Sequence, residues 1–163
     1  MRTLRLLAAT IALGACSTPS SDARFVATPP DRASFPPVAD LLDHRCGTLD
    51  CHGTTARNLR VYGSEGLRLD PNAKPSSQPS TTVAEYDEDF ASVVGLEPEV
   101  MSDVVKSGGA DPERLTFYRK ARGLEAHKAG TIVQAGDAQD TCIRSWLAGH
   151  TDASACKTGK DAF

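Results

Sequence analysis

The sequence is poor in aromatic side chains and contains no run of basic residues. Phe, Trp and Tyr together make up 6% of its 163 residues, so little aromatic surface is available for a core. The absence of a Lys/Arg stripe argues against a nucleic-acid-binding surface. Glycine-rich phosphate loops, paired catalytic carboxylates and a serine paired with a histidine are also lacking. The sequence therefore does not predict an enzyme.

The first 16 residues contain no apolar run long enough to span a bilayer, but they have the features of an export signal. Arg2 and Arg5 precede a short apolar core, and Leu13-Gly14-Ala15-Cys16 resembles a bacterial lipobox. We expect Cys16 to be lipidated and to become the first mature residue, with an ordinary secretory signal as the alternative. Because Ser17 rather than aspartate follows it, lipoprotein sorting rules suggest the outer membrane, facing the periplasm or the cell surface.

Export and lipidation define the expected domain organisation. Removal of residues 1–15 takes away two of the 18 basic side chains and leaves 16 against 21 acidic ones, a net charge of −5. Residues 17–37 contain five prolines among Ser, Thr and Asp, which predicts a disordered linker between the membrane and the domain. Residues 38–163 are left for one modest domain.

Apolar residues in this domain recur mostly at helical spacing, which predicts a mainly α fold. A first helix is expected from Pro36 or Pro37 to Gly47, and short extended segments at 59–62 and 67–69. Thr82 and Glu85 form a capping-box sequence at the start of an amphipathic helix ending at Gly95. Further helices are predicted from Pro98 to about Gly108, from Asp111 to Gly123, and from Asp137 to Ala148.

The most informative run is Cys46-Gly47-Thr48-Leu49-Asp50-Cys51-His52-Gly53. A cysteine directly followed by histidine is the hallmark of covalent haem attachment, in which thiols bond the vinyl groups and the imidazole binds iron. The usual motif has two residues between the cysteines, whereas this one has four. We expect the extra residues to bulge outward, with Gly47 supplying a positive φ. This interpretation assigns the thioethers to Cys46 and Cys51 and the proximal ligand to His52.

Two other interpretations of the same run stay open. Two exported cysteines five positions apart can form a small disulfide loop, with His52 an ordinary loop residue. The spacing also lies within that of zinc ligands, although no second pair follows. Separately, Cys142 and Cys156 enclose 15 residues counting both ends and are predicted to form a disulfide that joins the last helix to the C-terminal tail. Four cysteines remain after lipidation, an even number, as expected in an oxidising compartment.

With these residues in view, the chain resembles the cytochrome c-like domains of planctomycetes and related lipoproteins of myxobacteria. The matching segments occur in order: Cys51-His52-Gly53, then Gly66 to Asp70, then Asp111 to Arg122, and finally Cys142 to Gly149 with a tryptophan before a glycine. The resemblance covers roughly residues 38–149. It implies a small helical domain that binds haem c and transfers electrons, with an unidentified redox partner.

In that family the sixth iron ligand follows the third helix, commonly as methionine before proline. The corresponding segment here, Leu124 to Gly130, has no methionine, so His127 is the first candidate and Met101, on an apolar helix face, is the alternative. If the sixth position is open, peroxidase-like or gas-binding activity becomes a further alternative.

A haem-free, disulfide-bridged lipoprotein acting as a binding or structural module is the main competing hypothesis. The haem hypothesis also predicts porphyrin contacts from Tyr86, Phe90, Leu115, Tyr118, Trp146 and Leu147, which would form an ordinary core equally well.

Overall fold

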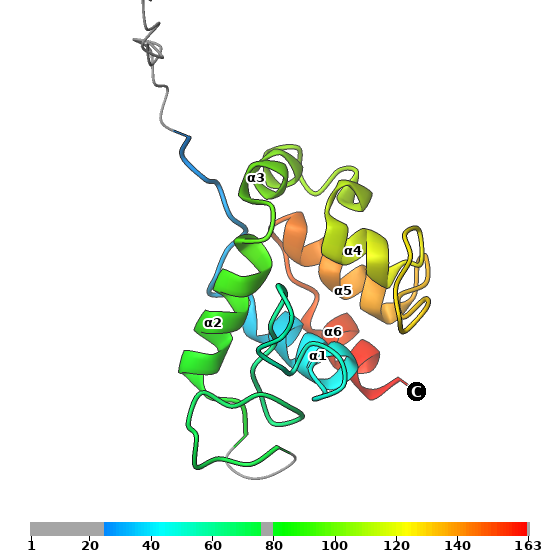
Figure 1. Cartoon of the computed structure of the whole chain (residues 1–163). Coiled ribbons are helices and arrows are strands. Elements are labelled where there is room, and N and C mark those ends of the chain that lie inside the picture. The colour runs from blue at the N-terminus through cyan, green and yellow to red at the C-terminus, as the bar shows by residue number, and fades with distance from the viewer. Residues whose placement is uncertain (1–24, 76–79, 163) are drawn as a thin grey trace, which may run out of the picture.

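The computed structural model describes residues 25–75 and 80–162. The predicted signal peptide, the predicted lipidation site Cys16 and the first part of the predicted linker lie outside these residues. The described chain is mainly helical, as predicted (Figure 1). Within these residues no helix is long and apolar enough to cross a membrane.

Six α-helices and one 3-10 turn make up the regular structure of the described residues. They are α1 (Pro36–Cys46), α2 (Val83–Val94), α3 (Pro98–Lys106), η1 (Pro112–Arg114), α4 (Thr116–Ala121), α5 (Ala138–Leu147) and α6 (Ala153–Asp161). The prediction of a single helix after Asp111 is wrong in detail, because Leu115 is extended and separates η1 from α4. The two predicted extended segments meet only in an isolated bridge between Tyr62 and Leu67.

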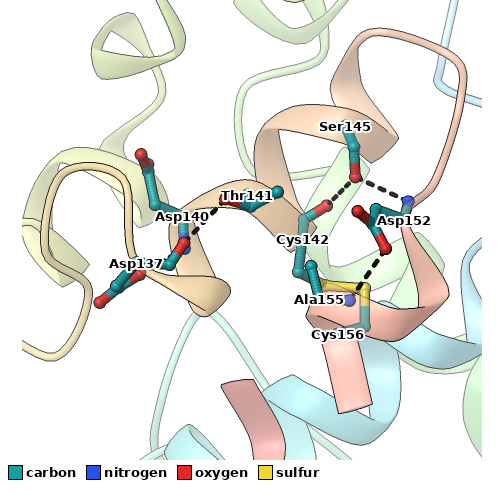
Figure 2. The surroundings of a disulfide bond; sticks show 8 residues. All are labelled: Asp137, Asp140, Thr141, Cys142, Ser145, Asp152, Ala155 and Cys156. Carbon is teal, nitrogen blue, oxygen red and sulfur yellow. Dashed lines mark hydrogen bonds between the residues drawn. A yellow bond between two sulfur atoms is a disulfide. The ribbon is translucent and has the colours of Figure 1, made fainter. Parts of the chain in front are cut away.

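The sequence reading did not predict α6, which packs against α1 and α5 (Figure 1). Asp152 caps this helix by accepting a hydrogen bond from the Ala155 amide at 2.9 Å. Gly159 argues against a helix by propensity. In the fold, however, a Cβ at this position would lie 2.9 Å from the amide nitrogen of Gln139, so glycine allows α6 to approach α5 closely. The predicted disulfide between Cys142 and Cys156 is present and joins these two helices (Figure 2).

Three aromatic rings form the centre of the core on the α2 side. The Phe35 ring lies 5.4 Å from that of Phe90 and 4.9 Å from that of Trp146, and Phe35 is only 1% exposed. The indole of Trp146 donates a hydrogen bond to the carbonyl of Asp31 at 3.3 Å. The packed chain therefore begins before the predicted boundary at residue 38. The apolar surface that the Phe35 ring buries holds this segment on the core, although prolines flank it.

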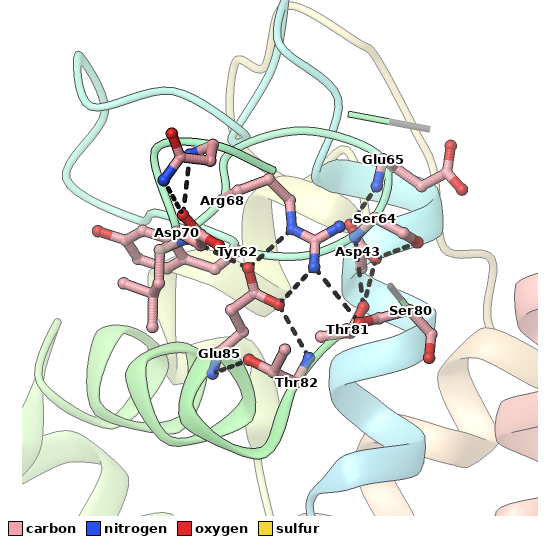
Figure 3. Close-up of polar contacts among 12 residues, drawn as sticks. Asp43, Tyr62, Ser64, Glu65, Arg68, Asp70, Ser80, Thr81, Thr82 and Glu85 are labelled. Carbon is pink, nitrogen blue, oxygen red and sulfur yellow. Dashed lines mark hydrogen bonds and ion pairs between the residues drawn. The ribbon is translucent and has the colours of Figure 1, made fainter. Parts of the chain in front are cut away.

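A buried polar network fastens residues 63–69 to α1 and α2 (Figure 3). Arg68 donates to both carboxylate oxygens of Glu85, with Nε 2.8 Å from Oε1 and Nη2 3.1 Å from Oε2. On the α1 side, buried Asp43 accepts hydrogen bonds from the hydroxyls of Thr81 and Ser64 and from the amide of Glu65. The capping box predicted at the start of α2 uses the same Glu85 carboxylate. The Arg68–Glu85 ion pair and the Asp43 carboxylate thus hold residues 63–69 in place, although this segment forms no helix or strand.

Asp89 on α2 is a second buried carboxyl in this region. It is fully buried and accepts a hydrogen bond from the Tyr62 amide at 2.6 Å, while its Oδ2 has no partner among the described residues. Burial raises the pKa of Asp89 to about 8, and the nearby carboxylates of Asp43 and Glu85 add to the increase. The carboxyl is therefore protonated in the fold at neutral pH.

We predict that Asp89 makes the protein less stable as the pH rises. Since the unfolded carboxyl titrates near 4, only the folded state holds this proton between about pH 4 and pH 8, and stability falls with rising pH by up to about 1.4 kcal/mol per pH unit. Asp89→Asn keeps an acceptor for the Tyr62 amide and should remove this slope, as measured by urea unfolding from pH 4 to 8. Glu99→Gln, an exposed change on α3, should keep it. Parallel pH profiles for the parent protein and Asp89→Asn would contradict the assignment.

Candidate functional site

The chain reverses direction between the two cysteines of the predicted attachment run. Cys46 is the last residue of α1, and the amide of His52 donates to the Cys46 carbonyl at 2.9 Å. Inside this turn, the amides of Cys51 and Gly53 both donate to the Thr48 carbonyl. The extra residues are therefore accommodated by a hydrogen-bonded loop, and Cys46, Cys51 and His52 all line one cavity.

Glycine is required in this loop for a reason that differs from the predicted one. The expectation of a positive φ at Gly47 is wrong, since its φ is −82°. A Cβ at Gly47 would instead lie 2.6 Å from the carbonyl oxygen of Asp43. Gly53 and Gly66 pack even more tightly, because a Cβ at either position would lie 1.8 Å from the carbonyl oxygen of Gly47. Backbone contact among three glycines thus closes the loop against residues 63–69.

This close packing predicts that Gly66→Ala disrupts the loop. The methyl group cannot be accommodated without moving the backbone, so we expect a loss of about 3 kcal/mol or more in the free energy of unfolding. Gly136→Ala is the control for backbone strain without a clash, because Gly136, unlike Gly66, has a positive φ and has no atom near its Cβ position. Its backbone strain alone should cost about 1–2 kcal/mol. Urea unfolding of both variants tests the prediction, which a smaller loss for Gly66→Ala than for Gly136→Ala would contradict.

The imidazole of His52 is oriented by the backbone of the following loop. Its Nδ1 lies 2.9 Å from the carbonyl oxygen of Leu59. Because a carbonyl only accepts, Nδ1 carries the proton, and Nε2 keeps a lone pair available for a metal. Burial lowers the pKa of His52, and the nearby His127 and basic side chains add to this effect. The ring is therefore in the neutral form that binds metals.

His127 lies opposite His52, on the segment that connects α4 to α5. The two ring centres are 6.2 Å apart and the ring planes differ by 24°. The Nδ1 of His127 lies 3.2 Å from the carbonyl oxygen of Gly130, so its Nε2 is also left as the acceptor nitrogen. The connecting segment is fastened to α4 by hydrogen bonds from the amides of Ile132 and Val133 to the carbonyl of Ala121.

One cavity of about 500 Å³ lies beside both imidazoles and both cysteines. This volume is within the range of pockets that bind cofactors and drug-sized ligands, roughly 300–1,000 Å³. Its wall is mainly apolar and comes from both halves of the chain, including Leu41, Leu42, Leu59, Phe117, Ile132 and Ile143. Basic side chains complete it: Arg45, Arg57, Lys120 and Lys128.

The two cysteines of the run are free thiols in this structure. Burial raises the pKa of the Cys46 thiol to about 12, and the neighbouring Cys51 adds to the increase. Both cysteines line the cavity. In the described part of the chain, no group of three or more His, Cys, Asp or Glu side chains is arranged to hold a metal ion.

The donor set fits a haem group in three respects. Two thiols are free to bond it, an apolar wall would cover a flat ring system, and two imidazoles line the same cavity.

The other residues that the sequence predicted to contact haem do not line the cavity. Met101 is 1% exposed in the core and does not line the cavity. The aromatic residues expected to contact a porphyrin do not line it either: Tyr86, Phe90, Tyr118 and Trp146 belong to the core or its edge, and Phe117 is the aromatic residue in the wall. Sequence reasoning missed the Leu59 carbonyl and Arg45, for which no pattern gives a signal.

Comparisons of this chain with protein-family models, with curated proteins and with solved structures find no match.

Proposed function

We propose that this protein is a monohaem c-type electron carrier of the cell envelope, held at the membrane by lipidated Cys16. In this proposal Cys46 and Cys51 form the thioethers, and His52 and His127 are the axial ligands. The chemistry that haem supplies when bound is one-electron transfer at its iron. The observation that carries the proposal is the meeting of two free thiols and two imidazoles on one largely apolar cavity.

The chain's own residues have three tasks in this function. The Leu59 and Gly130 carbonyls hold the two imidazoles in one tautomer and orientation, which favours ligation through Nε2. Apolar side chains from α1, α4 and α5 exclude water from the cavity, which lowers the cost of moving an electron. Histidine in place of methionine as the sixth ligand favours a lower reduction potential, since methionine raises it.

The first test is covalent attachment in a host that produces haem-maturation proteins. We expect a Soret band that survives acid–acetone extraction and a mass increase of one haem. The Cys46→Ala/Cys51→Ala double variant should abolish covalent attachment. The Cys142→Ala/Cys156→Ala double variant, which removes two cysteines outside the cavity, should keep it. A colourless protein with a Cys46–Cys51 disulfide from this host would refute the proposal and favour the haem-free module.

The second test concerns the sixth ligand. His127→Ala should change the low-spin visible spectrum to high-spin, and added imidazole should restore it, because a small ligand then fills the position that the side chain leaves. His150→Ala is the matched histidine control, since His150 is exposed and does not line the cavity. Met101→Leu should also leave the spectrum unchanged. A spectral change in Met101→Leu together with none in His127→Ala would reverse the assignment.

A further inference from the structure

Residues 59–62 hold His52 at two points. The Nδ1 of its ring lies 2.9 Å from the carbonyl oxygen of Leu59. Its backbone carbonyl accepts a hydrogen bond from the Val61 amide at 3.0 Å. Val61 is fully buried, so this segment is anchored in the core. The position of residues 59–62 therefore determines how the carbonyl acceptor meets the imidazole.

The same segment is fastened to α2 by its other two residues. The Tyr62 amide donates to Asp89 Oδ1 at 2.6 Å, and the Arg60 amide donates to the hydroxyl of Ser92 at 2.9 Å. Asp89 and Ser92 are three positions apart on α2 and therefore share one face of the helix. Alternate residues of the segment thus bond to His52 and to α2, because successive backbone groups of an extended chain point to opposite sides.

The stability of the fold does not explain why a carboxyl occupies position 89. Asp89 is fully buried, and the Tyr62 amide is its one hydrogen-bond partner among the described residues. A buried carboxyl with an unpaired oxygen is unfavourable, and such a group in a native structure calls for a further role. Its contact with the segment that orients His52 supplies that role, since residues behind a ligating histidine fix its geometry.

We propose that Asp89 is a positioning residue for His52, acting through residues 59–62, and that it thereby tunes the reduction potential of the bound haem. This inference rests on the proposed function. A carbonyl that accepts the Nδ1 proton makes the ligating nitrogen more basic. A more basic ligand stabilises the oxidised iron and lowers the potential. Asp89 does not line the cavity, so it acts on His52 only by holding the Leu59 carbonyl in place.

The first test needs no haem and uses the full chain at neutral pH, where the Asp89 carboxyl is protonated. Asp89→Ala removes the acceptor of the Tyr62 amide. The Val61 amide should then exchange with solvent about tenfold faster relative to the amides of α5, as expected for the loss of one buried hydrogen bond. The His52 ring should change from one tautomer to a mixture, read from the NMR shifts of its two nitrogens. Asp89→Asn keeps the acceptor and should restore both readouts.

Ser102→Ala is the matched control. Ser102 on α3 is also buried and accepts a hydrogen bond from a backbone amide, that of Thr28 at 2.8 Å, but it does not line the cavity or contact residues 59–62. This variant should keep the parent exchange rate and the single tautomer. Parent values in Asp89→Ala, or the same change in Ser102→Ala, would overturn the role of Asp89 and leave the proposed function standing.

A second measurement, on the covalently loaded protein, covers the case in which Asp89→Ala folds poorly without haem. Its reduction potential should be higher than that of the parent, because the Leu59 carbonyl no longer makes His52 more basic. Asp89→Asn and Ser102→Ala should have the parent potential. An unchanged or lower potential in Asp89→Ala would refute the tuning. Absence of covalent haem from the parent protein would instead overturn the proposed function, and the two haem-free readouts would be unaffected.

Discussion

The backbone hydrogen bond from the His52 amide to the Cys46 carbonyl is the contact on which the site depends. It closes a loop with four residues between the cysteines, so that both sulfurs and the imidazole reach one cavity. A single hydrogen bond of this kind contributes little net free energy to the stability of the fold. The loop is therefore fixed chiefly by what packs against it, and Gly53 and Gly66 approach the Gly47 carbonyl so closely that no side chain can intervene.

The loop in turn depends on the polar network beneath it. Residues 63–69 have no regular secondary structure, and their position comes from Asp43 on α1 and Glu85 on α2. Burying these carboxylates is unfavourable unless every oxygen is hydrogen-bonded, which is the case in the contacts of Glu85 with Arg68, Thr82 and Leu69. Asp89, with one oxygen unpaired, shows the alternative outcome, in which the carboxyl keeps its proton.

Sequence reasoning predicted the features that depend on local pattern. The starts of α1, α2, α3 and α5 follow from proline at the first turn or a capping side chain, and the short loop between Cys142 and Cys156 predicted their disulfide. Features that depend on long-range packing were missed. Gly159 reads as a helix breaker until α5 is seen to pack against it, and Phe35 reads as part of a linker until Phe90 and Trp146 surround it.

The site shows the same division between local and long-range signals. Cys46, Cys51 and His52 are recognisable because they are close in sequence, and that spacing alone left haem, disulfide and zinc as alternatives. His127 was selected by position relative to a family pattern, which says nothing about the orientation of its ring. The second half of the cavity, from Phe117 to Ile143, and the carbonyls that fix the tautomers have no sequence signature. They arise only when the chain is folded.

The contacts that hold His52 in place differ from those that hold His127. His52 is held by a loop that the glycine contacts, the polar network and the adjacent end of α1 all restrain. His127 is held by a segment whose links to α4 include two amide hydrogen bonds to Ala121, one from the Leu124 amide to Arg119, and the ion pairs of Glu125 with Arg119 and Lys120. Exposed ion pairs contribute little to stability. The His52 side of the cavity should therefore be the rigid one, and any exchange of an iron ligand in the proposed carrier would occur at His127.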